Sequence, residues 1–280
     1  MRCGLIDELA YLELLAETIG RVTAGSGRLK QSVADSSFDA WIKYYRQDEN
    51  SPNAIVSYYQ KGSLVGFALD ATIRIRSGGL YSLDDVMRAL WNGYGMIGVG
   101  VPEGGIEATV AKVTGLDLSA FFASAVQGTG DIDLVPLLKA FAVDMKMREA
   151  SVRKETDVAE ASLGARIGAR NGDAVLEQVL DGGAAQAAGL SAGDAVIAVD
   201  GLRVNGATLD KRIRSYPVGS TVNLTAFRRD ELMVFSVTLS PQEKTTCVLT
   251  SQNEPPEAAA RREAWLQSGK PAAVPARVGT

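Results

Sequence analysis

The chain has 280 residues, of which 46% are hydrophobic and 22% charged, and this composition is typical of a globular protein with about two domains. It contains no histidine, which excludes every site that needs imidazole, including Ser-His-Asp and Cys-His nucleophilic sites and HExxH zinc sites. The formal net charge of −4 argues against nucleic-acid binding, because phosphate contacts need clustered Lys and Arg.

The N-terminal residues show no targeting pattern. Acidic residues recur through residues 1–20, where a signal peptide would be apolar, and charges interrupt the longest apolar stretch at residues 53–75. We therefore expect no export signal and no membrane span, which favours the cytoplasm. Cys3 and Cys247 are far apart and form no CxxC pair, which predicts two unpaired thiols.

Up to about Val143, apolar residues recur mainly at helical spacing, which predicts a mostly helical region. Ser82 precedes two acidic residues and is the expected N-cap of one of these helices. Residues 145–160 are rich in Lys, Arg and Glu and poor in large apolar residues. This stretch predicts a solvated helix end or a linker.

From Ser162 to Ser240 the pattern changes to short alternating runs separated by turn residues, which predicts strands. The strands are expected at residues 163–169, 174–180, 195–199, 221–228 and 232–239, with short helices at 184–188 and 207–216. The predicted organisation is a helical region at 1–145, a linker at 146–160, a β-rich domain at 161–241 and a Pro/Ala-rich tail at 242–280 with a short helix.

The β-rich domain resembles the bacterial-type PDZ family. The resemblance is carried by Gly-Ala-Ala-Gln-Ala-Ala-Gly-Leu at 183–190 and by Ala-Gly-Asp-Ala-Val-Ile-Ala-Val-Asp-Gly at 192–201. In that family, backbone N–H groups of a glycine-containing loop bind a peptide carboxylate, and the peptide adds a strand beside a helix. The resemblance places the peptide-binding residues at Leu163, Gly164, Ala165, Leu209 and Ile213.

The loop departs from the commoner Gly-Leu-Gly-Phe form of this family. Its first position is Ser162 and its fourth is Ala165, which predicts a shallow or weakly selective pocket. The alternative is that Leu163, Leu209 and Ile213 are simply core residues and that the groove is unused.

The helical region closely resembles the glycyl aminopeptidase family of zinc metallopeptidases. Ser-Phe-Asp-Ala-Trp-Ile-Lys-Tyr-Tyr-Arg at 37–46, Glu-Asn-Ser-Pro-Asn at 49–53 and Val-Ser-Tyr-Tyr-Gln-Lys-Gly at 56–62 carry the resemblance. Members of this family also carry a PDZ domain after the catalytic domain. The implied fold is multidomain α+β: a helical subdomain of a thermolysin-like metallopeptidase, followed by a PDZ domain of antiparallel β structure with two short helices.

The activity implied by this resemblance is zinc-dependent removal of N-terminal residues, with Gly or other small residues preferred. The family's zinc ligands, two His of HExxH and a downstream Glu, are absent from this chain, and residues 5–19 resemble the segment just after the third ligand. The chain is therefore expected to be a truncated catalytic domain, either a fragment or a natural short product, whose partner is the missing N-terminal part. Zinc is expected only in the full-length parent, and the chain alone is expected to be inactive.

Tyr59 is the candidate catalytic residue. Tyr59-Gln60-Lys61-Gly62 is similar to the Tyr-x-Lys-Gly segment of aminopeptidase N-like enzymes, in which the tyrosine hydroxyl donates to the oxyanion. Tyr58 is the alternative donor, because neighbours on a helix point about 100° apart. Both tyrosines could instead be packing residues. The competing function is a non-catalytic PDZ peptide-binding or scaffolding protein.

Overall fold

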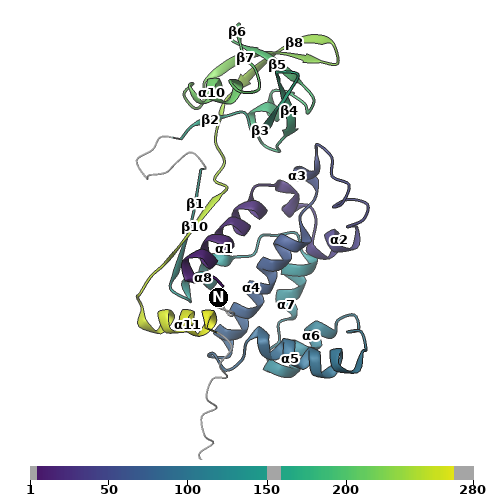
Figure 1. Cartoon of the computed structure of the whole chain (residues 1–280), viewed down its shortest axis with the longest axis vertical. Coiled ribbons are helices and arrows are strands. Elements are labelled where there is room, and N and C mark those ends of the chain that lie inside the picture. Colours follow the sequence, from purple (N-terminus) through teal and green to yellow (C-terminus); the bar gives the residue numbers. More distant parts are fainter. Residues whose placement is uncertain (1–4, 150–158, 268–280) are drawn as a thin grey trace, which may run out of the picture. The chain divides into compact units, whose positions relative to one another are not determined.

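The computed structural model describes residues 5–149 and 159–267 and divides into two compact units, each of which joins segments far apart in the sequence (Figure 1). The first unit comprises residues 1–19, 58–146 and 248–280, and the second comprises residues 20–57 and 147–247. Most of the predicted linker (150–158), the end of the predicted tail (268–280) and Cys3 lie outside the described residues.

The first unit is mainly helical. Its helices are α1 (Glu8–Thr23, which ends in the second unit), α4 (Tyr58–Arg76), α5 (Leu83–Gly93), α6 (Gly105–Thr114), α7 (Ser119–Phe122), α8 (Leu134–Lys139) and α11 (Pro256–Leu266), with short turns η2 (Gly95–Ile97) and η3 (Ala123–Gln127). The strands β1 (Val143–Arg148) and β10 (Thr246–Ser251) pair with each other.

Helix α4 is the central helix of the first unit, since ten of its nineteen residues are buried. A helix buried on most of its circumference must pair the charges that it carries. Asp70 forms an ion pair with Arg74 at 2.9 Å, and its other oxygen accepts the Leu83 N–H at 2.8 Å. The buried carboxylate thereby ties α4 to the start of α5.

The N-cap expected at Ser82 is present. The Asp85 carboxylate accepts hydrogen bonds from both the backbone N–H and the hydroxyl of Ser82, each at 2.9 Å. This arrangement satisfies donors that would otherwise be orphaned at the start of α5.

Strands β1 and β10 were not expected from the sequence. β1 continues to Arg148, into the stretch predicted to be a linker, and β10 lies in the predicted tail. In β1 the charged Asp144 and Lys146 alternate with apolar residues, a period-2 pattern that fits a strand as well as a solvated segment.

Helix α11, the short helix expected in the tail, is packed into the first unit. Trp265 is 6% exposed, and its ring contacts those of Tyr11, Phe67 and Phe141 at centroid distances of 5.3–5.6 Å. The tail therefore completes the core of this unit.

The second unit contains an antiparallel sheet with strand order β3-β4-β5-β7-β8. These strands are β3 (Ala165–Arg170), β4 (Asp173–Val179), β5 (Ala195–Val199), β7 (Thr221–Arg228) and β8 (Glu231–Thr238), close to the predicted ranges. β6 (Leu202–Arg203) pairs with β5, and β2 (Ala161–Ser162) pairs with β9 (Ser240–Pro241). Asn171 and Asp200, in the turns that follow β3 and β5, have positive φ.

Five short helical elements complete the second unit. α9 (Ala184–Ala187) and α10 (Leu209–Arg214) lie within the β-rich part. The segment 20–57, which comes before the first unit's α4 in the sequence, supplies η1 (Ser26–Leu29), α2 (Val33–Phe38) and α3 (Ser51–Ala54).

Cys247 is a free, buried thiol, as expected. Burial raises its pKa to about 11, so the thiol is protonated at neutral pH and unreactive. Among the described residues, no helix is long and apolar enough to span a bilayer.

We expect Trp265→Ala to lower the free energy of unfolding of the first unit by about 3–5 kcal/mol, because it removes a large buried ring. Urea denaturation followed by circular dichroism measures this change. Leu80→Ala is the control, since Leu80 belongs to the same unit and is 71% exposed, and its loss should cost less than about 0.5 kcal/mol. Equal effects of the two substitutions would contradict a structural role for α11.

Candidate functional site

Tyr58 and Tyr59 begin helix α4, and their ring centroids are 4.1 Å apart. Tyr59 is 57% exposed, while Tyr58 is partly buried. An exposed phenol can donate a hydrogen bond to a bound oxyanion. Because the two rings lie against each other, both tyrosines form the surface at this end of α4, and the choice of Tyr59 as donor stays a prediction.

Lys61 lies in the first turn of α4 and is only 1% exposed, and its Nζ donates to the Thr129 carbonyl oxygen at 3.3 Å. Burying an ammonium group is costly, and the helix dipole disfavours a cation at this end of a helix. The hydrogen bond ties the start of α4 to the loop at Thr129. The Tyr-x-Lys-Gly motif includes Lys61, but no local pattern indicates its burial.

The tyrosine pair is not part of a metal centre in the described part of the chain. Within residues 5–149 and 159–267, no three His, Cys, Asp or Glu side chains come together in a group that could hold a metal ion. Hydrolytic zinc sites use His together with carboxylate or Cys ligands, and the complete sequence has no histidine. The residues present do not fit a catalytic zinc ion.

The second candidate site is the loop before β3, in the second unit. Gly164 has a φ of +65°, and a Cβ at this position would lie 2.5 Å from the Cα of Gly183. The Gly164 carbonyl accepts the Leu180 N–H at 2.9 Å, and the Leu163 carbonyl accepts the Ala185 N–H at 2.7 Å. Only glycine fits this close approach, which holds the loop against residues 180–185.

One of the backbone N–H groups expected to donate to a peptide carboxylate already has a partner within the loop. The Gly164 N–H donates to the Ser162 hydroxyl oxygen at 3.0 Å. A peptide carboxylate would have to displace this hydroxyl to reach the Gly164 N–H. Ser162 is the position at which the loop departs from the Gly-Leu-Gly-Phe form, so the departure has a direct structural effect.

The three apolar residues proposed to line the groove are buried. Leu163, Leu209 and Ile213 belong to the core cluster of the second unit, while Ala165 is partly buried and packs against that cluster. β3 is an end strand, since within the described residues it pairs only with β4. The strand edge needed for peptide addition is therefore present, but the structure alone does not test whether it binds a peptide.

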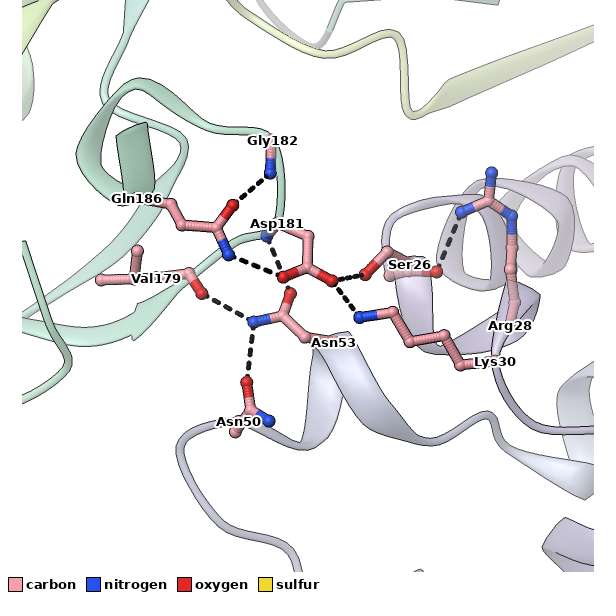
Figure 2. A network of polar contacts seen from close by, with 10 residues as sticks. Ser26, Arg28, Lys30, Asn50, Asn53, Val179, Asp181, Gly182 and Gln186 are labelled. Carbon is pink, nitrogen blue, oxygen red and sulfur yellow. Dashed lines mark hydrogen bonds and ion pairs between the residues drawn. The ribbon is translucent and has the colours of Figure 1, made fainter. Parts of the chain in front are cut away.

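A polar network links the segment 20–57 to the end of β4, within the second unit (Figure 2). The Asn53 side-chain amide donates to the Val179 carbonyl at 2.7 Å, and its oxygen accepts the Asp181 N–H at 3.0 Å. Asp181 in turn forms an ion pair with Lys30 and accepts the Ser26 hydroxyl at 2.7 Å. The amide of Asn53 thus bonds to backbone groups as a neighbouring strand would.

The Asp181 carboxylate is held in its ionised form. Hydrogen bonds from Lys30 and then Ser26 lower the pKa of Asp181 below its ordinary value. A lowered pKa in the folded state means that the contribution to stability is present at neutral pH and is lost as the pH falls through that lowered pKa.

A pocket of about 360 Å³ lies beside this network, lined by residues from the segments 23–29, 180–181 and 243–245 together with Asn53. The Asp181 carboxylate at its wall is bonded to Lys30, Ser26 and Gln186. The hydrogen bonds that this carboxylate accepts therefore all come from residues of the second unit. Nothing in the lining of the pocket points to a ligand.

The family models match the two regions of the chain that carry the sequence motifs. Residues 1–65 match the family model of M61 glycyl aminopeptidase, and residues 161–239 match that of the PDZ domain. The chain combines an M61 glycyl aminopeptidase segment with a PDZ domain. The M61 segment contains Tyr58, Tyr59 and Lys61, and the PDZ domain contains the Gly164 loop. A comparison with curated proteins gave no match.

Among solved structures, the chain is similar to an aminopeptidase N family protein from Idiomarina loihiensis, with 35% identity and a TM-score of 0.83. The match covers 94% of this chain but 45% of that chain, so this chain spans less than half the length of that protein. It also matches a serine endoprotease from Yersinia pestis at 16% identity and a TM-score of 0.29, over 32% of each chain. The latter match is too limited to support a conclusion.

We expect Asn53→Ala to lower the free energy of unfolding of the second unit by about 1–3 kcal/mol, because the Val179 carbonyl and the Asp181 N–H lose their partner. Urea denaturation measures the change. Asn50→Ala is the control, since Asn50 is exposed and accepts a single hydrogen bond from Asn53. A stability equal to that of the unmodified chain, or an equal loss in both variants, would contradict the bridging role of Asn53.

Proposed function

We propose that this chain is the C-terminal portion of a zinc-dependent aminopeptidase that prefers Gly or other small N-terminal residues. The observation that carries this proposal is the exposed Tyr59 at the start of α4, inside the segment that matches the M61 family. The extended similarity to an aminopeptidase N family structure supports the same reading.

In the proposed enzyme, the Tyr59 hydroxyl donates a hydrogen bond to the oxyanion that develops on the scissile carbonyl. A hydrogen-bond donor placed where negative charge develops on the carbonyl oxygen stabilises the transition state more than the bound substrate. The buried Lys61 supports this role, because it fixes the first turn of the helix that carries Tyr59. A donor held in place spends little free energy on reorganisation during the reaction.

The proposed zinc belongs to a part of such an enzyme that this chain does not contain, because the residues present do not fit the metal. The partner would be the N-terminal part of the catalytic domain. Three exposed apolar residues of the M61 segment, Phe38, Trp41 and Ile42, support such a partner. Exposed apolar side chains close together in sequence are typical of a surface that another protein part covers.

The PDZ domain is proposed to bind peptide or protein C-termini. The peptide would add a strand at the free edge of β3 and place its carboxylate at the loop formed by Leu163, Gly164 and Ala165. Because Ser162 occupies the Gly164 N–H, the expected affinity is micromolar or weaker, about 6–8 kcal/mol of binding free energy.

The second candidate function is a non-catalytic PDZ scaffolding protein. The complete PDZ fold and the absence of histidine favour it. Translating the DNA upstream of Met1 distinguishes the candidates: an HExxH motif followed by a Glu supports the peptidase, and a stop codon supports the scaffold. The cytoplasm is the proposed compartment for both, supported by the unpaired thiol of Cys247.

In a protein that includes the whole catalytic domain, Tyr59→Phe is expected to lower kcat by roughly 10²–10³ with little change in KM, because the lost donor acts on the oxyanion. Steady-state kinetics with a Gly-amide substrate measures both parameters. Tyr58→Phe is the matched control and should have a much smaller effect. The reverse order would move the role to Tyr58, and no effect from either would leave both as packing residues.

Ser162→Ala is expected to tighten binding of a free peptide C-terminus roughly fivefold, because it releases the Gly164 N–H, which is worth about 1 kcal/mol. NMR titration with matched free and amidated peptides measures the change. Ser215→Ala, at the exposed end of α10, is the control. A free carboxylate that binds no better than an amide would show that the loop is not a carboxylate site.

We expect Gly164→Val to distort the loop itself as well as to block a bound carboxylate. The positive φ of Gly164 and its close approach to Gly183 mean that any side chain at 164 strains the backbone. Loss of binding in that variant would therefore report local unfolding as well as a blocked carboxylate.

A further inference from the structure

Figure 1 shows helices α5 and α6 of the first unit. The hairpin that they form with η2 carries an apolar surface. We call it the 87–106 surface. Its members each have at least 43% of their surface exposed. They are Met87, Trp91, Met96, Ile97, Val99, Val101 and Ile106.

These side chains follow one another across adjoining elements. Met87 and Trp91 are four residues apart and lie on one face of α5. The Trp91 ring reaches Gly95, where a Cβ would lie 2.4 Å from it, so the ring lies on η2. Val101 lies against Gly105 at the start of α6 in the same way. α5 packs on both η2 and α6, so the members of the surface lie on adjoining elements.

The core of the unit does not need these residues. α5 and α6 contribute Val86 and Val110 to the core cluster, together with the partly buried Leu83 and Leu90. Met87 and Trp91 form an apolar part of the exposed face of α5, which also carries Arg88. An apolar face that is left over after the core is complete is typical of an interaction surface.

The size of the surface fits a protein interface. From their fractional exposures, and ~150–250 Å² for each large side chain, the seven members present on the order of 800 Å². The largest apolar patch on a monomer is usually about 300–600 Å². A standard stable interface buries about 800 Å² on each partner.

The lack of charge in the middle of the surface favours a second copy of the same chain as the partner. Residues 89–102 contain no Asp, Glu, Lys or Arg, and the residues that flank this stretch, Arg88 and Glu103, have opposite charges. A two-fold interface brings the same patch of each subunit together, and like charges near the axis would then repel. The lack of Lys and Arg in this stretch disfavours an anionic lipid surface, which attracts basic residues.

We propose that the 87–106 surface is the interface of a homodimer, in which it packs against the same surface of a second copy. Hydrophobic burial is the driving force, with Trp91 as the central anchor, because aromatic residues that are fully desolvated on association dominate such interfaces. The interface is formed by the first unit alone and is independent of the proposed catalytic and peptide-binding roles.

Size-exclusion chromatography with light scattering on the full chain tests this proposal. We expect a mass near twice the 29.6 kDa of one chain at micromolar concentrations, and a shift to the monomer mass in Ile97→Asp. Val234→Asp is the matched control, because Val234 and Ile97 are both 66% exposed and only Ile97 lies on the 87–106 surface. The control should remain a dimer.

Circular dichroism establishes that each variant is folded, and Met96→Asp repeats the test at a second exposed position if Ile97→Asp unfolds. A monomeric unmodified chain would overturn the proposal, as would equal dissociation of the Val234 and Ile97 variants. A chain that stays monomeric but floats with phosphatidylcholine vesicles, and loses this binding in Ile97→Asp, would overturn it in favour of a lipid surface.

Discussion

The side-chain amide of Asn53 sets the organisation of the second unit. It bonds to Val179 and Asp181 as a neighbouring strand would, and Leu180, between them, donates its N–H to the Gly164 carbonyl. The Gly164 loop, the end of β4 and the segment 20–57 are therefore joined by a series of hydrogen bonds. A loop held from both sides is preorganised, so a bound peptide would pay little for ordering it. The same rigidity limits how far the loop can adapt to a ligand.

The strands of the PDZ domain were predictable because each depends on local pattern. β7 alternates apolar and polar residues, β4 and β5 contain short apolar runs, and a turn residue such as Asp200 marks where β5 ends. β1 and β10 were missed for a physical reason. They pair across about a hundred residues of sequence. In β1 the charged residues give a local pattern that also fits a linker.

The candidate sites were also predictable only where they depend on local sequence motifs. Motifs indicated Tyr59 and the Gly164 loop, but the burial of Lys61, Leu209 and Ile213 depends on packing that sequence spacing does not report. The contacts of Asp181 join residues up to 155 positions apart. Ser162 shows the opposite case, since its departure from the usual motif was visible in the sequence and its effect on the Gly164 N–H required the structure.

The PDZ domain is more than an appended module, because its fold includes contacts with the segment that leads directly into α4. Any energetic coupling between a peptide at the Gly164 loop and Tyr59 through the chain would pass from Leu180 and Asp181 to Asn53 and then along residues 54–57. The coupling free energy between two sites cannot exceed the difference in interaction free energy between the two conformations that the ligands favour. The two neutral hydrogen bonds at Asn53 can contribute about 1–3 kcal/mol to such coupling, which is within the ordinary range of coupling between sites. The Lys30–Asp181 ion pair and the hydrogen bond from Ser26 join the same two segments.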